Sequence, residues 1–137
     1  DVVEADGPIL KQDTWHHLAG VFTGAEVLLY VDGQLIGRRT SRGARRPNDL
    51  PLIVGADVDG SGNPTGHFVG VLDELRISNI ARYTGDSFEP GDTYAIDEHT
   101  VLQLPLDGQR GPWVRDVSPT GTHPTVNGDP TLYEYDR

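Results

Sequence analysis

The sequence predicts an all-β protein, on three observations. The chain has 137 residues with 17 glycines and 10 prolines, which are frequent in turns and rare inside helices. Its apolar residues occur in short runs, and several of these runs alternate large with small or apolar with polar side chains, as strands do. No stretch of ten residues has the spacing of an amphipathic helix. At this length we expect one domain, or one domain and part of another.

The first expected elements form an antiparallel meander. Residues 15–22 alternate large and small side chains, and a Thr-Gly pair then turns the chain. Residues 26–31 follow as a second strand. Asp32-Gly33 indicates a two-residue hairpin, because a type I′ turn needs positive φ at both central positions. Residues 34–37 return as a third strand.

Two more strands are expected before residue 80. Residues 50–55 form one strand, a polar loop covers residues 57–66, and residues 68–78 form a longer strand. Alternation along the longer strand places Asp73 on its mostly apolar face. An inward-facing Asp73 would serve either as a metal ligand or as a hydrogen-bond anchor to the adjoining strand.

A stretch rich in acidic residues, glycine and proline follows these strands. It spans residues 84–98, and its composition indicates a linker or a long surface connection. We therefore place a boundary near His99, which divides the chain into residues 1–98 and 99–137. Beyond the boundary, residues 101–106 alternate as a strand.

Composition limits the classes of function. Lys and Arg number 11 and Asp and Glu 21, so the net charge is −10, which repels polyphosphate and argues against nucleic acid as a partner. Cysteine is absent, so disulfides and thiolate zinc sites are excluded. No apolar run approaches the ~18 residues of a membrane helix, so membrane insertion is not expected. Because the chain begins with Asp1, we expect a processed chain or a piece of a longer protein.

Four sequence blocks stand out by their order and spacing. They are TWHHLAGVF at 14–22, LYVDG at 29–33, IVG at 53–55, and residues 68–83 with FVGVLDELRI and ARY. Together they resemble the C-terminal half of a concanavalin A-like, laminin G-like (LamG) jelly-roll domain. The resemblance covers about residues 1–90 and implies a partial or circularly permuted β-sandwich from an extracellular or cell-surface protein.

A second segment resembles the opening strands of the same family. It comprises residues 101–108, 116–118 and 121–123, although Pro119 interrupts the family's usual glycine-rich turn. In this family the first and last strands lie side by side. Residues 99–137 would therefore complete the sandwich in cis or on a neighbouring chain. Both alternatives stay open, because a half sandwich leaves strand edges unpaired, and such edges recruit another strand.

One loop carries a partial calcium pattern. From residue 57 it has oxygen side chains at alternating positions and glycine at the sixth. The twelfth position is Phe68, which excludes an EF-hand. The alternative to a Ca²⁺ site is an ordinary solvated turn. The candidate ligands are Asp57, Asp59, Ser61, Asn63 and, from the next strand, Asp73.

Three aromatic residues have no core position in the resemblance. We predict that they form an exposed platform on which a sugar ring stacks, with simple packing as the alternative. These candidate ligand-binding residues are Trp113, Tyr133 and Tyr135.

Five arginines follow the meander in an otherwise acidic chain. They form either a solvated loop or an electrostatic contact with an anionic polysaccharide or with the acidic stretch of another copy. These candidate interaction residues are Arg38, Arg39, Arg42, Arg45 and Arg46.

No catalytic pattern is present in the sequence. Jelly-roll glycosidases need two carboxylates presented together, whereas Asp73 and Glu74 would point to opposite faces of a strand. We therefore expect no enzyme but an extracellular adhesion or carbohydrate- or protein-binding module, with or without a stabilising Ca²⁺. Its partner would be a glycan or an extracellular protein. The alternative is a structural subunit of an extracellular filament or assembly, completed by strand exchange with other copies or with a missing N-terminal half.

Overall fold

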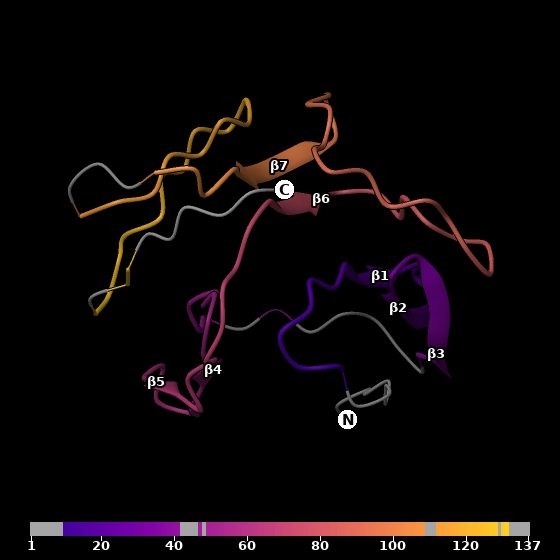
Figure 1. Cartoon of the computed structure of the whole chain (residues 1–137), viewed down its shortest axis with the longest axis horizontal. Coiled ribbons are helices and arrows are strands. Elements are labelled where there is room, and N and C mark those ends of the chain that lie inside the picture. The colour runs from indigo at the N-terminus through magenta and orange to yellow at the C-terminus, as the bar shows by residue number, and fades with distance from the viewer. Residues whose placement is uncertain (1–9, 42–46, 48, 109–111, 129, 132–137) are drawn as a thin grey trace. The chain divides into compact units, whose positions relative to one another are not determined.

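A computed structural model gives the fold and describes residues 10–41, 47, 49–108, 112–128 and 130–131 (Figure 1). The described residues form strands and no helix, which confirms the all-β fold class. None of them forms a helix long and apolar enough to cross a membrane. The chain has two compact units, one of residues 1–44 and 78–100 and one of residues 45–77 and 101–137. The expected division at residue 99 into two LamG-like segments stays a prediction.

The meander of the first unit is confirmed. β1 (Leu18–Phe22), β2 (Glu26–Val31) and β3 (Gln34–Thr40) form an antiparallel sheet in the order β1-β2-β3. Asp32 and Gly33 have φ values of 50° and 74°, so the turn has the expected positive φ at both positions. A Cβ at Gly33 would also collide with the carbonyl oxygen of Phe88, and only glycine avoids this collision.

The core of the first unit lies on one face of this sheet. Val21, Leu28 and Tyr30 are buried there, and the Tyr30 ring is fully covered. Tyr83 and Phe88 stack on each other with ring centroids 3.6 Å apart, and both meet Tyr30 edge-on. The hydrophobic effect of burying these rings is the main stabilising contribution that the unit offers.

Residues 85–88 are bound to the sheet through the backbone as well. The Tyr30 hydroxyl donates a 2.8 Å hydrogen bond to the carbonyl oxygen of Gly85. Leu35 N donates to Asp86 O at 2.9 Å, and Phe88 N donates to Gly33 O at 2.8 Å. This part of the acidic stretch therefore packs against β2 and β3.

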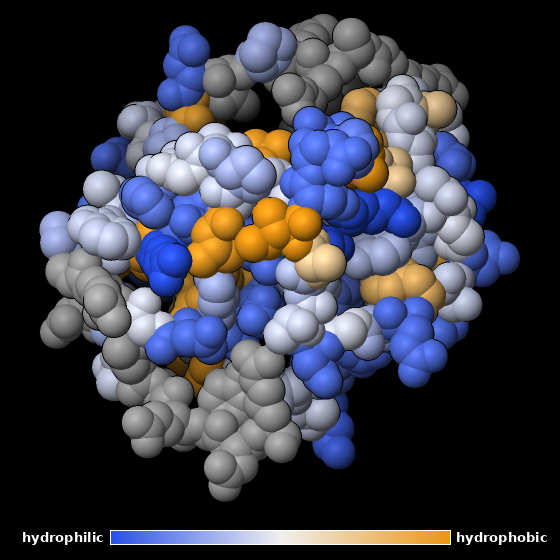
Figure 2. Space-filling view, turned by 90° about the horizontal axis from the view of Figure 1, so that it is seen from above, coloured by the Kyte–Doolittle hydropathy of each residue, from blue (hydrophilic) through white to orange (hydrophobic). Residues whose placement is uncertain are grey.

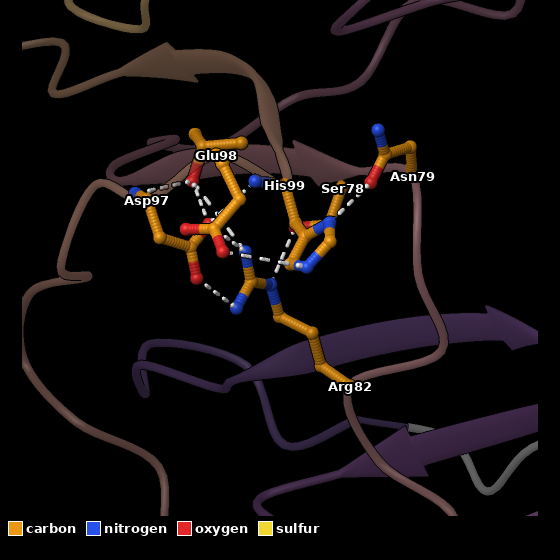
Figure 3. Close-up of polar contacts among 7 residues, drawn as sticks. Ser78, Asn79, Arg82, Asp97, Glu98 and His99 are labelled. Atoms are coloured by element: carbon orange, nitrogen blue, oxygen red, sulfur yellow. Dashed lines mark hydrogen bonds and ion pairs between the residues drawn. The ribbon is translucent and has the colours of Figure 1, made fainter.

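A polar cluster fixes the end of the acidic stretch (Figure 3). The Arg82 guanidinium donates to both carboxylate oxygens of Asp97, at 2.9 and 2.6 Å, and to Ser78 Oγ at 2.6 Å. The Asp97 carboxylate also accepts the backbone N–H of His99 and the hydroxyl of Thr100, each at 3.0 Å. The Arg82 guanidinium holds the pKa of Asp97 far below its usual range. The pair therefore stays ionised at neutral pH and remains so further into acid than an isolated carboxyl would.

The remaining strands are short. β4 (Asp57–Val58) and β5 (Pro64–Thr65) form an antiparallel pair inside the expected polar loop. β6 (Leu75–Ser78) is the hydrogen-bonded neighbour of β7 (Thr100–Leu104). Leu102 and Leu104 of β7 are buried.

Two expected strands differ from the structure. Residues 50–55 form no strand, and Pro51 supplies no N–H to a ladder there. Of residues 68–78 only β6 is a strand. Glu74, directly before it, has a φ of 48°, so β6 cannot extend back through this residue. The alternation that was expected to turn Asp73 inward does not apply to an interrupted strand.

Apolar side chains reach the surface between the polar ones on the face drawn in Figure 2. Among the exposed large apolar residues, two belong to β1 and four lie in the irregular segment before β6. They are Leu18 and Phe22 in β1, and Phe68, Val69, Val71 and Leu72 in the segment.

Candidate functional site

Trp113 is held on a short ribbon of two antiparallel backbone segments in the second unit. Val114 N donates to Pro124 O at 2.9 Å, and Val126 N donates to Pro112 O at 2.8 Å. These bonds lie on both sides of an isolated bridge at Trp113. The backbone that carries the indole is therefore fixed before any ligand binds.

His123 supports the indole from one side. The two ring centroids are 5.1 Å apart and the rings are tilted by 41°. His123 Nδ1 accepts a 3.0 Å hydrogen bond from the backbone N–H of Asp116. Because a backbone N–H can only donate, this contact fixes both the orientation of the imidazole and the nitrogen that accepts.

Asp116, whose N–H bonds His123, is buried, and its carboxylate holds the neighbouring backbone in place. Its carboxylate accepts the backbone N–H groups of Gln103, Ser118 and Thr122 at 2.8–2.9 Å and the Ser118 hydroxyl at 2.9 Å. Burial raises the pKa of the Asp116 carboxyl, but these hydrogen bonds outweigh burial and hold the pKa below its usual value. The carboxylate thus ties β7 to the segment that carries Trp113.

The exposed part of Trp113, 37% of the residue, lines a pocket of about 450 Å³. Asp107 and Arg115 line the same pocket, and both are exposed. The chain bends into it at Leu106, which has a φ of 62°. The pocket therefore offers an aromatic face, a carboxylate that accepts hydrogen bonds and a guanidinium that donates them. Its lining residues are Pro105, Leu106, Asp107, Gly108, Trp113, Arg115 and Val117.

The family model described as the concanavalin A-like lectin/glucanases superfamily, a laminin G domain model, matches residues 1–85. The chain belongs to this laminin G-like family. This confirms the resemblance drawn from the four sequence blocks and, with it, the jelly-roll fold class. No curated protein and no solved structure matches the chain. The LamG-like match ends before the Trp113 pocket, so the resemblance of the second segment stays a prediction.

The candidate calcium ligands of this LamG-like chain are held by local hydrogen bonds. Asp59 Oδ1 accepts the N–H groups of Ser61 and Asn63 at 2.8 and 2.9 Å, and these bonds hold the pKa of Asp59 below its usual value. Asp57 Oδ1 accepts Val58 N at 2.7 Å. This is the pattern of a hydrogen-bonded turn between β4 and β5.

Among the residues that the structure describes, no three His, Cys, Asp or Glu side chains gather around one point. Ca²⁺ takes 6–8 oxygen ligands, several of them usually carboxylates. The Ca²⁺ assignment to Asp57, Asp59, Ser61, Asn63 and Asp73 stays a prediction.

The candidate arginines are described only in part. Arg38 lies 3.9 Å from Glu26 and 3.6 Å from Asp86 of the same chain. Arg39 is exposed on β3. Arg42, Arg45 and Arg46 lie outside the described residues, as do Tyr133 and Tyr135 of the aromatic set. The predicted electrostatic contact stays a prediction.

Trp113 was a candidate from the sequence, whereas two residues around it were not, and its ligand-binding role stays a prediction. Arg115 follows Trp113 by two positions, a spacing that places both side chains on one face of an extended segment, and this signal was available. His123 reaches the indole only through the ribbon pairing, which has no local sequence signal.

Proposed function

We propose that this laminin G-like chain is a non-catalytic carbohydrate-binding module of an extracellular or cell-surface protein. The pocket at Trp113 is the observation that carries the proposal. A partly exposed indole stacks against the apolar face of a pyranose ring. The hydroxyl groups around the ring need both hydrogen-bond acceptors and hydrogen-bond donors. Asp107 accepts their hydrogen bonds and Arg115 donates to their oxygens.

Rigidity of the site supports binding. The ribbon bonds, the His123 ring and the Asp116 anchor fix the Trp113 segment in advance. Binding to a preorganised group avoids the conformational entropy of ordering it. Family membership supports a binding role, and it also motivates the extracellular location in the proposal.

The chemistry of the pocket argues against hydrolysis. Glycosidases flank the scissile bond with two carboxyl groups. Asp107 is the one carboxylate among the described residues that line this pocket. A ligand held there would therefore be bound and released unchanged.

The test is retention on immobilised polysaccharides, measured by affinity electrophoresis against a panel of neutral and anionic polymers. We expect at least one polymer to retard the chain, and Trp113→Ala to remove the retardation. Trp15→Ala is the matched control, because Trp15 is the chain's other tryptophan, is exposed and does not line the pocket. Equal retardation of Trp113→Ala and the unmodified chain would contradict the proposal, as would no retardation by any polymer.

A further inference from the structure

His123 has a backbone conformation that few residues with a side chain adopt. Its φ is 49°, in the left-handed region, and such a conformation persists only where surrounding contacts hold it. The turn that leads to it is bonded in two places. Gly121 N donates to Ser118 O at 3.2 Å. Thr122 N donates to the Asp116 carboxylate at 2.9 Å. The turn therefore fixes the backbone that carries the imidazole.

One hydrogen bond then sets the position of the imidazole. The Asp116 N–H donates to His123 Nδ1 at 3.0 Å, so the neutral ring has its proton on Nε2. His123 is exposed and can take up a second proton from water. That proton would sit on Nδ1 and face the N–H of Asp116, and two donors cannot bond each other. Only the neutral imidazole keeps this contact.

The Asp116 carboxylate offers the protonated ring no replacement. Its Oδ1 accepts the N–H groups of Gln103 and Ser118. Its Oδ2 accepts the Ser118 hydroxyl and the Thr122 N–H, so the lone pairs of both oxygens are in use. These bonds hold the pKa of Asp116 below its usual value, and the carboxylate stays ionised where histidines titrate. His123 is therefore the group whose charge changes here.

The Trp113 indole packs against this ring. The two centroids are 5.1 Å apart and the rings are tilted by 41°. An indole face attracts a cation, but a protonated His123 cannot stay in its present position beside the Asp116 N–H. A ring that turns away from that N–H changes its contact with the indole as well. Because Trp113 lines the pocket, protonation of His123 changes the aromatic wall of the pocket.

We propose that His123 is a pH-sensitive positioning residue of the Trp113 pocket. Its neutral ring holds the indole in the geometry that binds a sugar, and its protonation releases the indole, so the pocket binds at neutral pH and lets go in acid. This inference rests on the proposed carbohydrate-binding function. Histidine suits the role because its charge changes between about pH 5 and 8. Besides Asp116, the charged groups of this pocket among the described residues are Asp107 and Arg115, and both are kept in every variant.

The first measurement needs no ligand. The chain has two tryptophans, so Trp15→Phe leaves Trp113 as its single indole. The emission of Trp113 is recorded from about pH 8 to pH 5, and the NMR signals of the His123 ring give the pH at which that ring is protonated. We expect the two transitions to have the same midpoint.

His123→Asn is the matched control in the same Trp15→Phe chain. Asparagine tolerates a positive φ, and its side-chain oxygen accepts the Asp116 N–H at every pH. We therefore expect no emission transition in His123→Asn.

The second measurement is binding to beads that carry the neutral and anionic polysaccharides of the panel, at about pH 7.5 and pH 5.5. Beads replace electrophoresis because the chain has a pI near 4.7 and migrates little in acid. We expect the unmodified chain to bind about fivefold more weakly in acid, or weaker still, which is the lower end of the usual coupling between sites. His123→Asn should bind equally at both pH values to a neutral polymer.

Four results would overturn the inference. They are an emission that does not titrate, the same emission transition in His123→Asn, equal affinity of the unmodified chain at both pH values, and the same acid loss in His123→Asn. If no polysaccharide binds at either pH, the proposed function fails, whereas an emission transition that follows His123 still supports the switch. If His123→Asn does not fold, the amide proton of Asp116 replaces it as the readout. An Asp116 amide signal that does not follow the His123 titration counts against the inference.

Discussion

His16 Nδ1 lies 2.8 Å from Asp32 Oδ2, while its Nε2 lies 3.1 Å from the carbonyl oxygen of Lys11. Both ring nitrogens thus face acceptors, and only the protonated imidazole can donate to both. The hydrogen bond to Asp32 raises the pKa of His16 above its ordinary 6.5. The same contact lowers the pKa of Asp32 below 3.8.

The His16–Asp32 pair predicts a loss of stability as the pH rises above 6.5. A His pKa that is raised by folding contributes stability that is fully present below pH 6.5 and is lost as the pH rises through the folded-state pKa. We expect the free energy of unfolding, measured with urea, to fall over that window. His16→Gln should remove this component of the pH dependence. An unchanged pH profile in His16→Gln would contradict the assignment.

The Arg82–Asp97 pair predicts that lysine at position 82 keeps the positive charge but does not restore the stability that arginine provides. Arg82 donates two parallel hydrogen bonds to one carboxylate, and lysine supplies a single compact charge. We expect Arg82→Ala to lower the free energy of unfolding by about 1.5–3 kcal/mol, the range for hydrogen bonds to charged groups. Arg82→Lys should recover less than half of the loss in a urea titration. Full recovery by lysine would show that the two-point contact is dispensable.

The hydrogen bonds of the Asp116 carboxylate predict that its removal lowers the free energy of unfolding even when no ligand is bound. Asp116→Ala leaves buried N–H groups without an acceptor, which costs about 1–3 kcal/mol for each unsatisfied group. We expect a loss of about 3 kcal/mol or more in the free energy of unfolding. Asp107→Ala is the control, because Asp107 is exposed and such substitutions stay within about 0.5 kcal/mol. Equal stability of the two variants would remove the anchoring role.

The hydrogen-bonded turn at Asp59 predicts that Ca²⁺ does not change stability. Calcium at one hundred times its dissociation constant would add about 2.7 kcal/mol to the free energy of unfolding. We expect no such gain in thermal unfolding with Ca²⁺ against EDTA, because the Asp59 carboxylate already accepts hydrogen bonds from the N–H groups of Asn63 and Ser61. A gain that Asp59→Ala removes would instead support the calcium interpretation.

Local signals predicted the parts of the fold that local geometry determines. Asp32-Gly33 specified its turn because both residues tolerate positive φ, and β1 to β3 followed from alternation around it. The expected strand at residues 68–78 was too long, because the sequence gives no signal for the positive φ at Glu74 that precedes β6. The acidic stretch was interpreted as a linker because its composition is polar, yet Phe88 packs on Tyr30, 58 positions earlier in the chain.

In the candidate site too, the sequence predicted what depends on local signals and not what depends on pairing between segments. Trp113 was predictable as an aromatic residue without a core role. Its support by His123 and the anchor at Asp116 depend on pairing between segments several residues apart, which alternation does not encode. Composition and alternation therefore pointed to the exposed indole and gave no signal for the contacts with His123 and Asp116 that hold its segment in place.

The cover of Tyr30 by Tyr83 and Phe88 also determines when this unit can fold during synthesis. The meander is complete once residue 40 has been made, but its core face remains open to water until Phe88 has left the ribosome. A nascent chain that stalls between these points displays Val21, Leu28 and Tyr30 as an uncovered apolar sheet. That interval is when chaperone binding or aggregation would compete with folding.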